Sequence, residues 1–477
     1  MGFFGAAGAR LGAVFMLLEV RLFEPERALR AFEGPQVRQN ASRLFCASVC
    51  PGCRLHKLIC TARGNGRTTI HNRHSPAADL AAALMLAFVA IDIWKIQNVT
   101  HDVIVVGLGA MGSAALYHLT RQNLARQNIR VLGLERFEPG HERGSSHGRT
   151  RIIRHGYFEH PSYVPLVRRA AAMWRELEQQ SGQSLMTVTG IAEIGNPDSE
   201  LIKGTLAASR EHELPHEILT ARELMKLYPA FRIPEDFVAV LQPDGGFVQA
   251  EAGIRAHLRL AAAAGAEIHT GERVVAIEQF STNVRVTTER GTFEAGSVIV
   301  SAGAWTKSLL PGLNLPLQAT RQVLLWVKPA QPDLFRVGWF PVFMIESEDG
   351  IHYGFPLHAE DGLKIAKHHH AGEIVDPDSY DRTVSPADEA SIMKPIHRFL
   401  PASAGPIVSA RTCLYTMAPD EDFVIDRAPG QERIIVASPC SGHGFKFAPA
   451  IGQALAELAL RGKTSFDLSR FRIGRFT

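Results

Sequence analysis

One glycine-rich turn constrains the fold of this chain more than any other feature of its sequence. The segment Gly-Leu-Gly-Ala-Met-Gly at 107–112 directly follows the apolar run 103–106 and opens a helical pattern that reaches about residue 126. In such a strand–turn–helix setting Gly107 permits the tight turn, Gly109 lets a pyrophosphate approach the backbone, and Gly112 lets helix and strand pack closely. The N–H groups at the helix N-terminus attract phosphate. The pattern therefore predicts a dinucleotide site.

An acidic residue ends the next predicted strand, 131–135. The carboxylate of Glu135 can accept hydrogen bonds from ribose hydroxyls, and its charge disfavours a 2′-phosphate. FAD or NAD is therefore favoured over NADP. Arg136, directly beside this acid, weakens that preference, and it is also a predicted cofactor contact.

Two later segments of small residues separate FAD from NAD. A predicted strand at 298–300 ends in Ser-Ala-Gly-Ala, which contains Ala302, and a further loop near the C-terminus contains Gly442 and Gly444. Each can bring backbone close to an extended cofactor. Because these segments lie so far along the chain from the first turn, they favour FAD over NAD, whose enzymes usually carry one contiguous nucleotide fold.

The alternation of strands and helices predicts an α/β protein with more than one domain. At 477 residues, with 46% hydrophobic and 21% charged residues, the chain can bury a sizeable core. We predict a Rossmann-like FAD-binding domain interleaved with a mixed-sheet substrate domain. The predicted FAD-binding pieces are 101–189, 249–319 and 406–477, and the substrate pieces are 190–248 and 320–405. Residues 1–100 lack this alternation and are predicted to be a poorly ordered, spurious extension.

Composition argues against several classes of partner. The net charge of +3 gives no reason to expect nucleic acid, and no apolar run reaches the roughly 18–20 residues of a membrane span. Six cysteines, four of them in the first 60 residues, do not suit a disulfide scaffold and favour a reducing, cytoplasmic location. The run His368–His370 is not predicted to bind metal, since consecutive residues of a strand point to opposite faces.

Four further motifs together resemble a known enzyme family. They are Gly-Ser-Ser-His-Gly-Arg-Thr-Arg-Ile-Ile-Arg-His at 144–155, Tyr-Gly-Phe-Pro at 353–356 with the segment 362–368, Cys-Leu-Tyr-Thr-Met-Ala-Pro-Asp-Glu-Asp-Phe at 413–423, and Ser-Gly-His-Gly-Phe-Lys-Phe at 441–447. In this order they resemble the family of monomeric sarcosine oxidase and N-methyl-L-tryptophan oxidase. The resemblance runs from about residue 102 to residue 476.

The resemblance implies a fold, a cofactor and a reaction. The fold is of the D-amino-acid-oxidase type, and the FAD is joined through its 8α-methyl group to a cysteine that matches Cys413. The enzyme oxidises an N-methyl amino acid, such as sarcosine or N-methyl-L-tryptophan, to an imine while O2 becomes H2O2. Water then releases formaldehyde and the free amino acid. The family implies a monomer. The alternatives are a flavin amine dehydrogenase with another acceptor, an oxidase of a cyclic secondary amino acid, and a non-catalytic flavin-binding regulator.

The resemblance also implies roles for single residues. Arg154 and Lys446 match the pair that binds the substrate carboxylate, an anion suited to a guanidinium fork and an ammonium group. Lys364 matches the lysine where O2 reacts, since a cation stabilises developing negative charge. The other matched residues lie near the flavin (His147, Thr150 and Arg151) or in the substrate pocket (Tyr353, Tyr415 and His368). Of these, Lys364, Arg151 and His368 are the catalytic candidates.

Simpler roles remain open for some of these residues. Core packing is the alternative for Tyr353, Tyr415 and His368, and packing or loop capping is the alternative for His147. Ser146 and Arg149 also depart from the His and Asp that relatives often carry, which leaves the hydrogen bonding of this loop undetermined.

Overall fold

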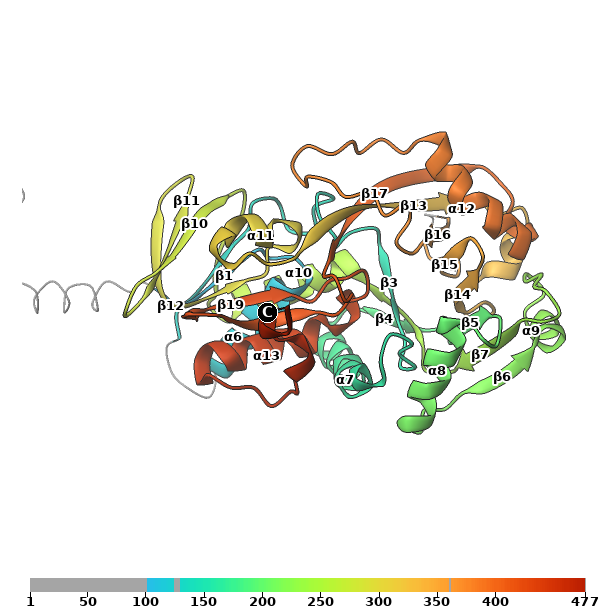
Figure 1. Ribbon diagram of the computed structural model, residues 1–477, viewed down its shortest axis with the longest axis horizontal. Helices are drawn as coiled ribbons and strands as arrows, with labels where there is room; N and C mark the ends of the chain where they lie inside the picture. Colours follow the sequence, from blue (N-terminus) through green and yellow to red (C-terminus); the bar gives the residue numbers. More distant parts are fainter. Residues whose placement is uncertain (1–100, 124–128, 360–361, 477) are drawn as a thin grey trace, which may run out of the picture. The chain divides into compact units, whose positions relative to one another are not determined.

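The computed structural model describes residues 101–123, 129–359 and 362–476 (Figure 1). The predicted extension, 1–100, lies outside these residues. Within the described part, no helix is both long and apolar enough to cross a lipid bilayer.

The glycine-rich turn leaves the central strand of the first sheet. β1 (His101–Val106) pairs in parallel with β2 (Val131–Leu134) on one side and with β12 (Thr292–Val300) on the other. The sheet is completed by parallel and antiparallel neighbours: β9 (Glu267–His269), β10 (Val274–Gln279), β11 (Val284–Thr288), β18 (Val424–Ala428) and β19 (Gln431–Ser438). β1 and β2 are buried on both faces along almost their whole length, so they read as nearly continuous apolar runs.

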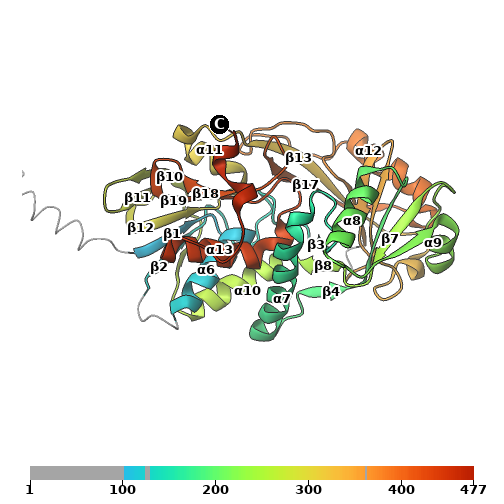
Figure 2. The same cartoon turned by 60° about the horizontal axis from the view of Figure 1, so that its bottom comes forward.

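Helices from three parts of the chain pack together beside this sheet (Figure 2). They are α6 (Ala110–Asn123), α10 (Ala250–Ala263) and α13 (Ala448–Arg461), and α7 (Val164–Ser181) packs on the last two. The backbones of α6 and α13 approach closely at Gly452, where an added Cβ would come within 2.6 Å of Ala114. This side of the first sheet is therefore assembled from residues near both ends of the described chain.

The second sheet is mixed and carries its own core. Its strand order is β17-β13-β16-β15-β14-β5-β7-β6. The bounds are β5 (Ile191–Gly195), β6 (Glu217–Thr220), β7 (Val238–Gln242), β13 (Gln318–Val327), β14 (Val342–Ser347), β15 (Gly350–Gly354), β16 (Leu363–Lys367) and β17 (Ile407–Met417). The remaining helices are α8 (Glu200–Glu211), α9 (Ala221–Leu227), α11 (Thr306–Leu309) and α12 (Pro386–Phe399). α12 begins at a capping box between Ser385 and Asp388.

A small third sheet is built from three short segments of the chain. It is formed by β3 (Thr150–Ile153), β8 (Gly246–Gln249) and β4 (Met186–Val188) in antiparallel pairs. β3 carries Arg151 and leads directly into Arg154. The segment between the glycine-rich turn and the second sheet is thereby held at a defined position.

The α/β class predicted from the sequence is confirmed, and predicted elements lie close to observed ones. The helix predicted after the glycine-rich turn is α6, the strand predicted at 131–135 is β2, and the strand predicted at 298–300 is the end of β12. The range 406–477, predicted as part of the FAD-binding domain, contains β17, which pairs along β13 of the second sheet. The division into domains stays a prediction.

Candidate active site

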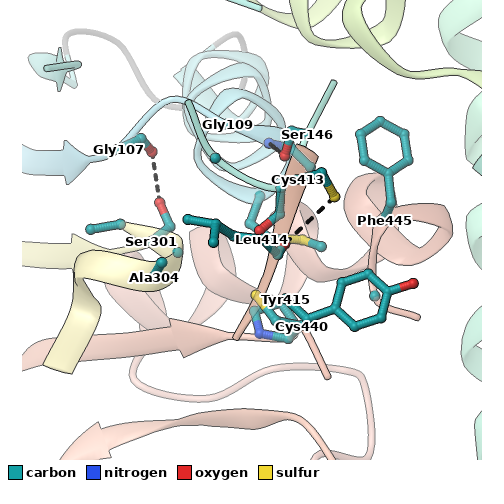
Figure 3. Close-up of a pocket in the computed structure, with 18 of the residues that line it drawn as sticks. Gly107, Gly109, Ser146, Ser301, Ala304, Cys413, Leu414, Tyr415, Cys440 and Phe445 are labelled. Atoms are coloured by element: carbon teal, nitrogen blue, oxygen red, sulfur yellow. Dashed lines mark hydrogen bonds between the residues drawn. The ribbon is translucent and has the colours of Figure 1, made fainter. Parts of the chain in front are cut away.

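A cavity of about 340 Å³ connects the glycine-rich turn with one face of the second sheet (Figure 3). Most of the predicted site residues line it: Gly107, Gly109, Glu135, Arg136, Arg151, Arg154, Ala302, Tyr353, His368, Cys413, Tyr415, Gly442, Gly444 and Lys446. The other four, Gly112, His147, Thr150 and Lys364, are buried and are not part of the lining. The fold thus brings residues from every predicted motif to one place.

At two of its three glycines, the glycine-rich turn has no room for a side chain. Gly107 has a φ of +85°, and a Cβ there would come within 2.7 Å of the Ser301 carbonyl oxygen. A Cβ at Gly112 would lie 1.8 Å from the Gly107 carbonyl oxygen. At Gly109 the nearest atom to such a Cβ is Ser146 Oγ at 3.4 Å, so its backbone faces open space. Two glycines therefore shape the turn, and the third leaves the backbone accessible.

Glu135 is held by the same turn. Its Oε2 accepts a hydrogen bond from Leu108 N at 2.7 Å, and its Oε1 accepts one from Phe137 N at 3.0 Å. Burial raises the pKa of Glu135, although these N–H donors oppose the shift. Each carboxylate oxygen can accept a further hydrogen bond from a group in the cavity.

Arg136 closes the same end of the cavity with a partner from a distant loop. Its Nη1 lies 2.6 Å from Asp378 Oδ1, which also accepts a hydrogen bond from Trp305 Nε1 at 2.9 Å. The guanidinium lies over the ring of Trp305, 5.6 Å from its centroid. Arg136, Trp305 and Asp378 form what we call the Arg136 clasp.

Cys413 lies on the face of the second sheet that meets the cavity. Residues two apart on a strand share a face, so β17 presents Cys413 and Tyr415 together, and Tyr353 joins them from β15. The Cys413 thiol is 2% exposed. Burial raises its pKa, while Arg151 and Lys364 act to lower it. Figure 3 shows this sulfur on the same side of the site as Ser146 and Gly109.

Lys364 and Arg151 are fixed by backbone carbonyl groups of the segment 144–155. Lys364 Nζ donates to Gly148 O and Thr150 O, both at 2.7 Å. Arg151 donates from Nη2 to Ser145 O at 2.7 Å. Burial and the charge of Arg151 hold the pKa of Lys364 well below its usual value. The two cations lie close enough to influence each other, and only Arg151 lines the cavity.

Several polar atoms of this segment are buried without a partner in the described part of the chain. They are Ser145 Oγ, Thr150 Oγ1 and both ring nitrogens of His147. Burial, Arg151 and Lys364 lower the pKa of His147 to about 3, so its ring is neutral near pH 7. Of these residues, Ser145 lines the cavity, so its hydroxyl is available to a molecule bound there.

Arg154 is buried beside two carboxyl groups. Its Nη2 lies 2.6 Å from both oxygens of Glu159, and its Nη1 donates to Gly156 O at 2.9 Å. Its Nε lies 3.9 Å from Glu193 Oε1. Burial favours the uncharged form of Glu159, but Arg154, His443 and Lys446 together outweigh it and the pKa of Glu159 lies below its usual value. Arg154 is therefore charged and already paired.

Lys446 reaches the same space from the loop before α13. Its Nζ donates to His443 O at 2.7 Å and to Tyr157 Oη at 3.4 Å. Burial and the charge of Arg154 lower the pKa of Lys446 to about 7. An anion in the cavity would raise this pKa again, because it favours the charged ammonium form.

An aromatic wall faces these charges. His368 Nδ1 and Tyr415 Oη are 3.3 Å apart, and both side chains press on Gly442, where an added Cβ would come within 2.6 Å of the Tyr415 ring. Burial lowers the pKa of His368 well below its usual value, so it is neutral.

The reasoning from the sequence about the histidine run was wrong in one respect. His368–His370 do not lie on a strand, because β16 ends at Lys367 and the three residues form a turn. The backbone of His369 and His370 has positive φ, and the ring of His370 has a different partner from that of His368. His368 meets Tyr415, whereas His370 bonds Asp388 at 2.8 Å.

The family is shown by comparison with known proteins. The model of the family described as FAD dependent oxidoreductase (DAO) matches residues 102–458. The chain belongs to this family of FAD-dependent oxidoreductases. Its α/β architecture is accordingly the D-amino-acid-oxidase type of FAD-binding fold, as the sequence predicted.

Individual relatives of this FAD-dependent oxidoreductase are similar over nearly their whole length. Monomeric sarcosine oxidase of Streptomyces avermitilis is 40% identical over 377 residues, covering 78% of this chain and 97% of that protein. N-methyl-L-tryptophan oxidase of Yersinia pestis is 36% identical over 379 residues, covering 79% and 99%. Among solved structures, NikD, an amino acid oxidase essential for nikkomycin biosynthesis, is 27% identical with a TM-score of 0.69, covering 78% and 97%.

The residues present in the oxidoreductase fit FAD. The open backbone at Gly109 suits the pyrophosphate, and Glu135 offers free lone pairs where a ribose would lie. The unpartnered Ser145 hydroxyl lies at the cavity and can bond the polar edge of a flavin ring. When bound, FAD supplies a two-electron acceptor for oxidation of the substrate.

Some residues of the site were not found from the sequence. Glu159 pairs with Arg154, Glu193 lies behind it, and Met344 and Cys440 line the cavity. Glu159 lies five residues after Arg154 in the same loop, so its charge was a usable signal. The others carried no such signal, because Glu193 and Met344 are placed by the second sheet and Cys440 reads as a structural cysteine.

Proposed function

We propose that this chain is an FAD-dependent oxidase that demethylates an N-methyl amino acid, with sarcosine or N-methyl-L-tryptophan as the substrate. The products are the free amino acid, formaldehyde and H2O2. One observation carries the proposal: two buried cations, Arg154 and Lys446, line the cavity that also holds Cys413 and the phosphate turn. The names of the relatives support the substrate class.

In this proposal the two cations bind and orient the substrate carboxylate. Arg154 would exchange part of its pairing with Glu159 for the substrate, and Lys446 would keep its bond to His443 O while offering a remaining N–H. A carboxylate held between them would raise the pKa of Lys446. The aromatic wall of Tyr353, Tyr415 and neutral His368 would then exclude water from the alkyl group and the neutral amine.

Lys364 is our candidate for the oxygen step. Negative charge developing nearby would favour its protonated form, and its two carbonyl partners hold the ammonium group in place. Lys364→Met should slow reoxidation by about a hundredfold and leave anaerobic reduction by substrate nearly unchanged. Stopped-flow absorbance measures the two half-reactions separately, and an unchanged reoxidation rate would remove Lys364 from this role.

We further propose a thioether between Cys413 and the flavin. The position of the thiol on the cavity wall supports it, and Arg151 and Lys364 favour the thiolate. Acid-precipitated wild-type protein should stay yellow, whereas Cys413→Ser should release its colour into the supernatant. Cys440→Ser is the matched control, because Cys440 also lines the cavity and should leave the colour bound.

A substrate panel tests the function as a whole. Sarcosine or N-methyl-L-tryptophan should bleach the flavin without oxygen, and air should then restore the colour with one H2O2 per turnover. Glycine serves as the unmethylated control, and L-proline tests a cyclic secondary amine. If neither N-methyl amino acid bleaches the flavin, the proposal is wrong.

The state and location of the enzyme are also proposals. The name of its monomeric relatives supports a monomer. Cys413 and Cys440 are free thiols in the described chain, which suits a reducing cytoplasm.

A further inference from the structure

A buried carboxyl group lies behind the substrate-binding arginine and has no part in the proposed function. Glu193, on β5, is 0% exposed and does not line the cavity. Its Oε2 accepts a hydrogen bond from Gln242 Nε2 at 2.7 Å. Its Oε1 has no hydrogen-bond partner among the residues that the structure describes, and lies 3.9 Å from Arg154 Nε. The unpartnered oxygen is therefore the one that faces Arg154.

Glu193 and Arg154 are also joined through a chain of hydrogen bonds. Ile191 of β5 pairs with Gln242 of β7, and Gln242 Oε1 accepts a bond from Gly156 N at 2.7 Å. Gly156 O in turn accepts a bond from Arg154 Nη1 at 2.9 Å. These hydrogen-bonded groups are closely packed, since a Cβ at Gly156 would come within 2.1 Å of Gln242 Nε2. The position of Glu193 is thus coupled to that of the arginine.

While Arg154, Lys446 and Glu159 are charged, the protonation state of Glu193 sets the net charge of this cluster. The charged groups that face Glu193 are Arg154, Glu159 and Lys446. The neutral side chains beside it are Gln242, which donates a hydrogen bond to it, and Thr205. When all four ionisable groups are charged, two cations offset two carboxylates. When Glu193 is neutral, the cluster carries one spare positive charge. Burial raises the pKa of Glu193 to about 7, against the opposing effect of Arg154, so both states are accessible near neutral pH.

We propose that Glu193 is a positioning residue for Arg154 whose protonation supplies the spare positive charge that a substrate carboxylate neutralises. This rests on the proposed role of Arg154 and Lys446 as the carboxylate pair. Binding of a carboxylate by the ionised form then takes up one proton from solvent at Glu193. An ionised Glu193 competes with the substrate for Arg154, because both would be carboxylates near the same guanidinium in a site of low dielectric constant.

The test is carboxylate binding as a function of pH in the flavin-loaded enzyme. Acetate is titrated between pH 7.5 and 9, and binding is followed by the change in flavin absorbance. Each proton linked to binding weakens it about tenfold per pH unit in this range. The acetate affinity of the wild type should fall more steeply with pH than that of Glu193→Gln, and the difference between the two slopes should be about tenfold per pH unit. At pH 9 the variant should bind acetate more tightly than the wild type. Calorimetry in two buffers should show that Glu193→Gln takes up about one proton fewer than the wild type when acetate binds.

Two outcomes overturn the inference. One is the same dependence of acetate affinity on pH in both proteins. The other is a loss of affinity in the variant by the same factor at every pH, which is what a merely structural role of Glu193 would produce. If wild type does not bind acetate, or if Arg154→Met binds it equally well, the proposed function fails instead.

A second variant keeps the test valid if Glu193→Gln does not fold. Glu193→Gln combined with Gln242→Glu keeps both hydrogen bonds, because the new carboxylate accepts from Gly156 N and from the new amide. Two N–H donors keep that carboxylate ionised in this pH range. The double variant should therefore show the shallow slope of the single variant, and a wild-type slope would contradict the inference.

Discussion

Removing the carboxylate of Glu159 should lower the stability of the folded protein and raise its affinity for a carboxylate ligand. In the free protein Glu159 occupies the guanidinium that the substrate needs, with both oxygens 2.6 Å from Arg154 Nη2. Glu159→Gln keeps an oxygen that can accept one hydrogen bond and removes the competing charge. The same change therefore acts on folding and on binding with opposite signs.

The expected magnitudes follow from the burial of the pair. Arg154 is 3% exposed and Glu159 16%, so breaking the pair approaches the about 3–5 kcal/mol of a buried ion pair. The remaining amide hydrogen bond reduces this to about 2–3 kcal/mol. A ligand carboxylate no longer displaces a charge-assisted bond of about 1.5–3 kcal/mol, so acetate should bind about 10- to 150-fold more tightly.

The assay combines thermal unfolding with acetate titration of the flavin-loaded enzyme. Glu159→Gln should unfold at lower temperature than wild type without acetate, and saturating acetate should recover most of the loss. Because the pKa of Glu159 lies below its usual value, the titration of Glu159 itself adds no pH dependence to the gain in affinity near neutral pH. Glu176→Gln is the matched control: its pair with Arg169 at 2.8 Å is exposed and worth less than about 1 kcal/mol. Unchanged or weaker acetate binding by Glu159→Gln would refute the reasoning.

Three further predictions concern the turn, the clasp and the ammonium group. Gly112→Ala should yield little flavin-loaded protein, because its Cβ would overlap the Gly107 carbonyl, whereas Gly291→Ala, with open space around its Cβ, should be normal in flavin content per chain. Asp378→Asn weakens the Arg136 clasp and should speed loss of non-covalent FAD in a Cys413→Ser background, measured by dialysis; an unchanged rate would show that the clasp does not retain the cofactor. Acetate affinity should fall as pH rises through about 7, since Lys446 binds the anion in its protonated form, and Lys446→Met should bind acetate weakly with a flatter pH profile.

Local sterics explain why the cofactor end of the site could be predicted from the sequence. Gly112 is required by a backbone contact with Gly107, five residues away, and Gly107 by its own positive φ in the turn. The apolar strand before the turn reports burial on both faces. The substrate end of the cavity was predicted less well. The histidine run was assigned to a strand, although positive φ at His369 and His370 places it in a turn.

By itself the sequence determined the α/β class, the dinucleotide turn and the residue types that meet in the cavity, because these depend on short-range periodicity and on motifs with fixed spacing. Only the tertiary structure decided which charges face one another. Glu193 reaches Arg154 because β5 and β7 pair in one register, and Lys364 is held by carbonyl groups more than two hundred residues away in the chain. Electrostatic coupling depends on distance and burial in space, and neither is written in the spacing of residues along a chain.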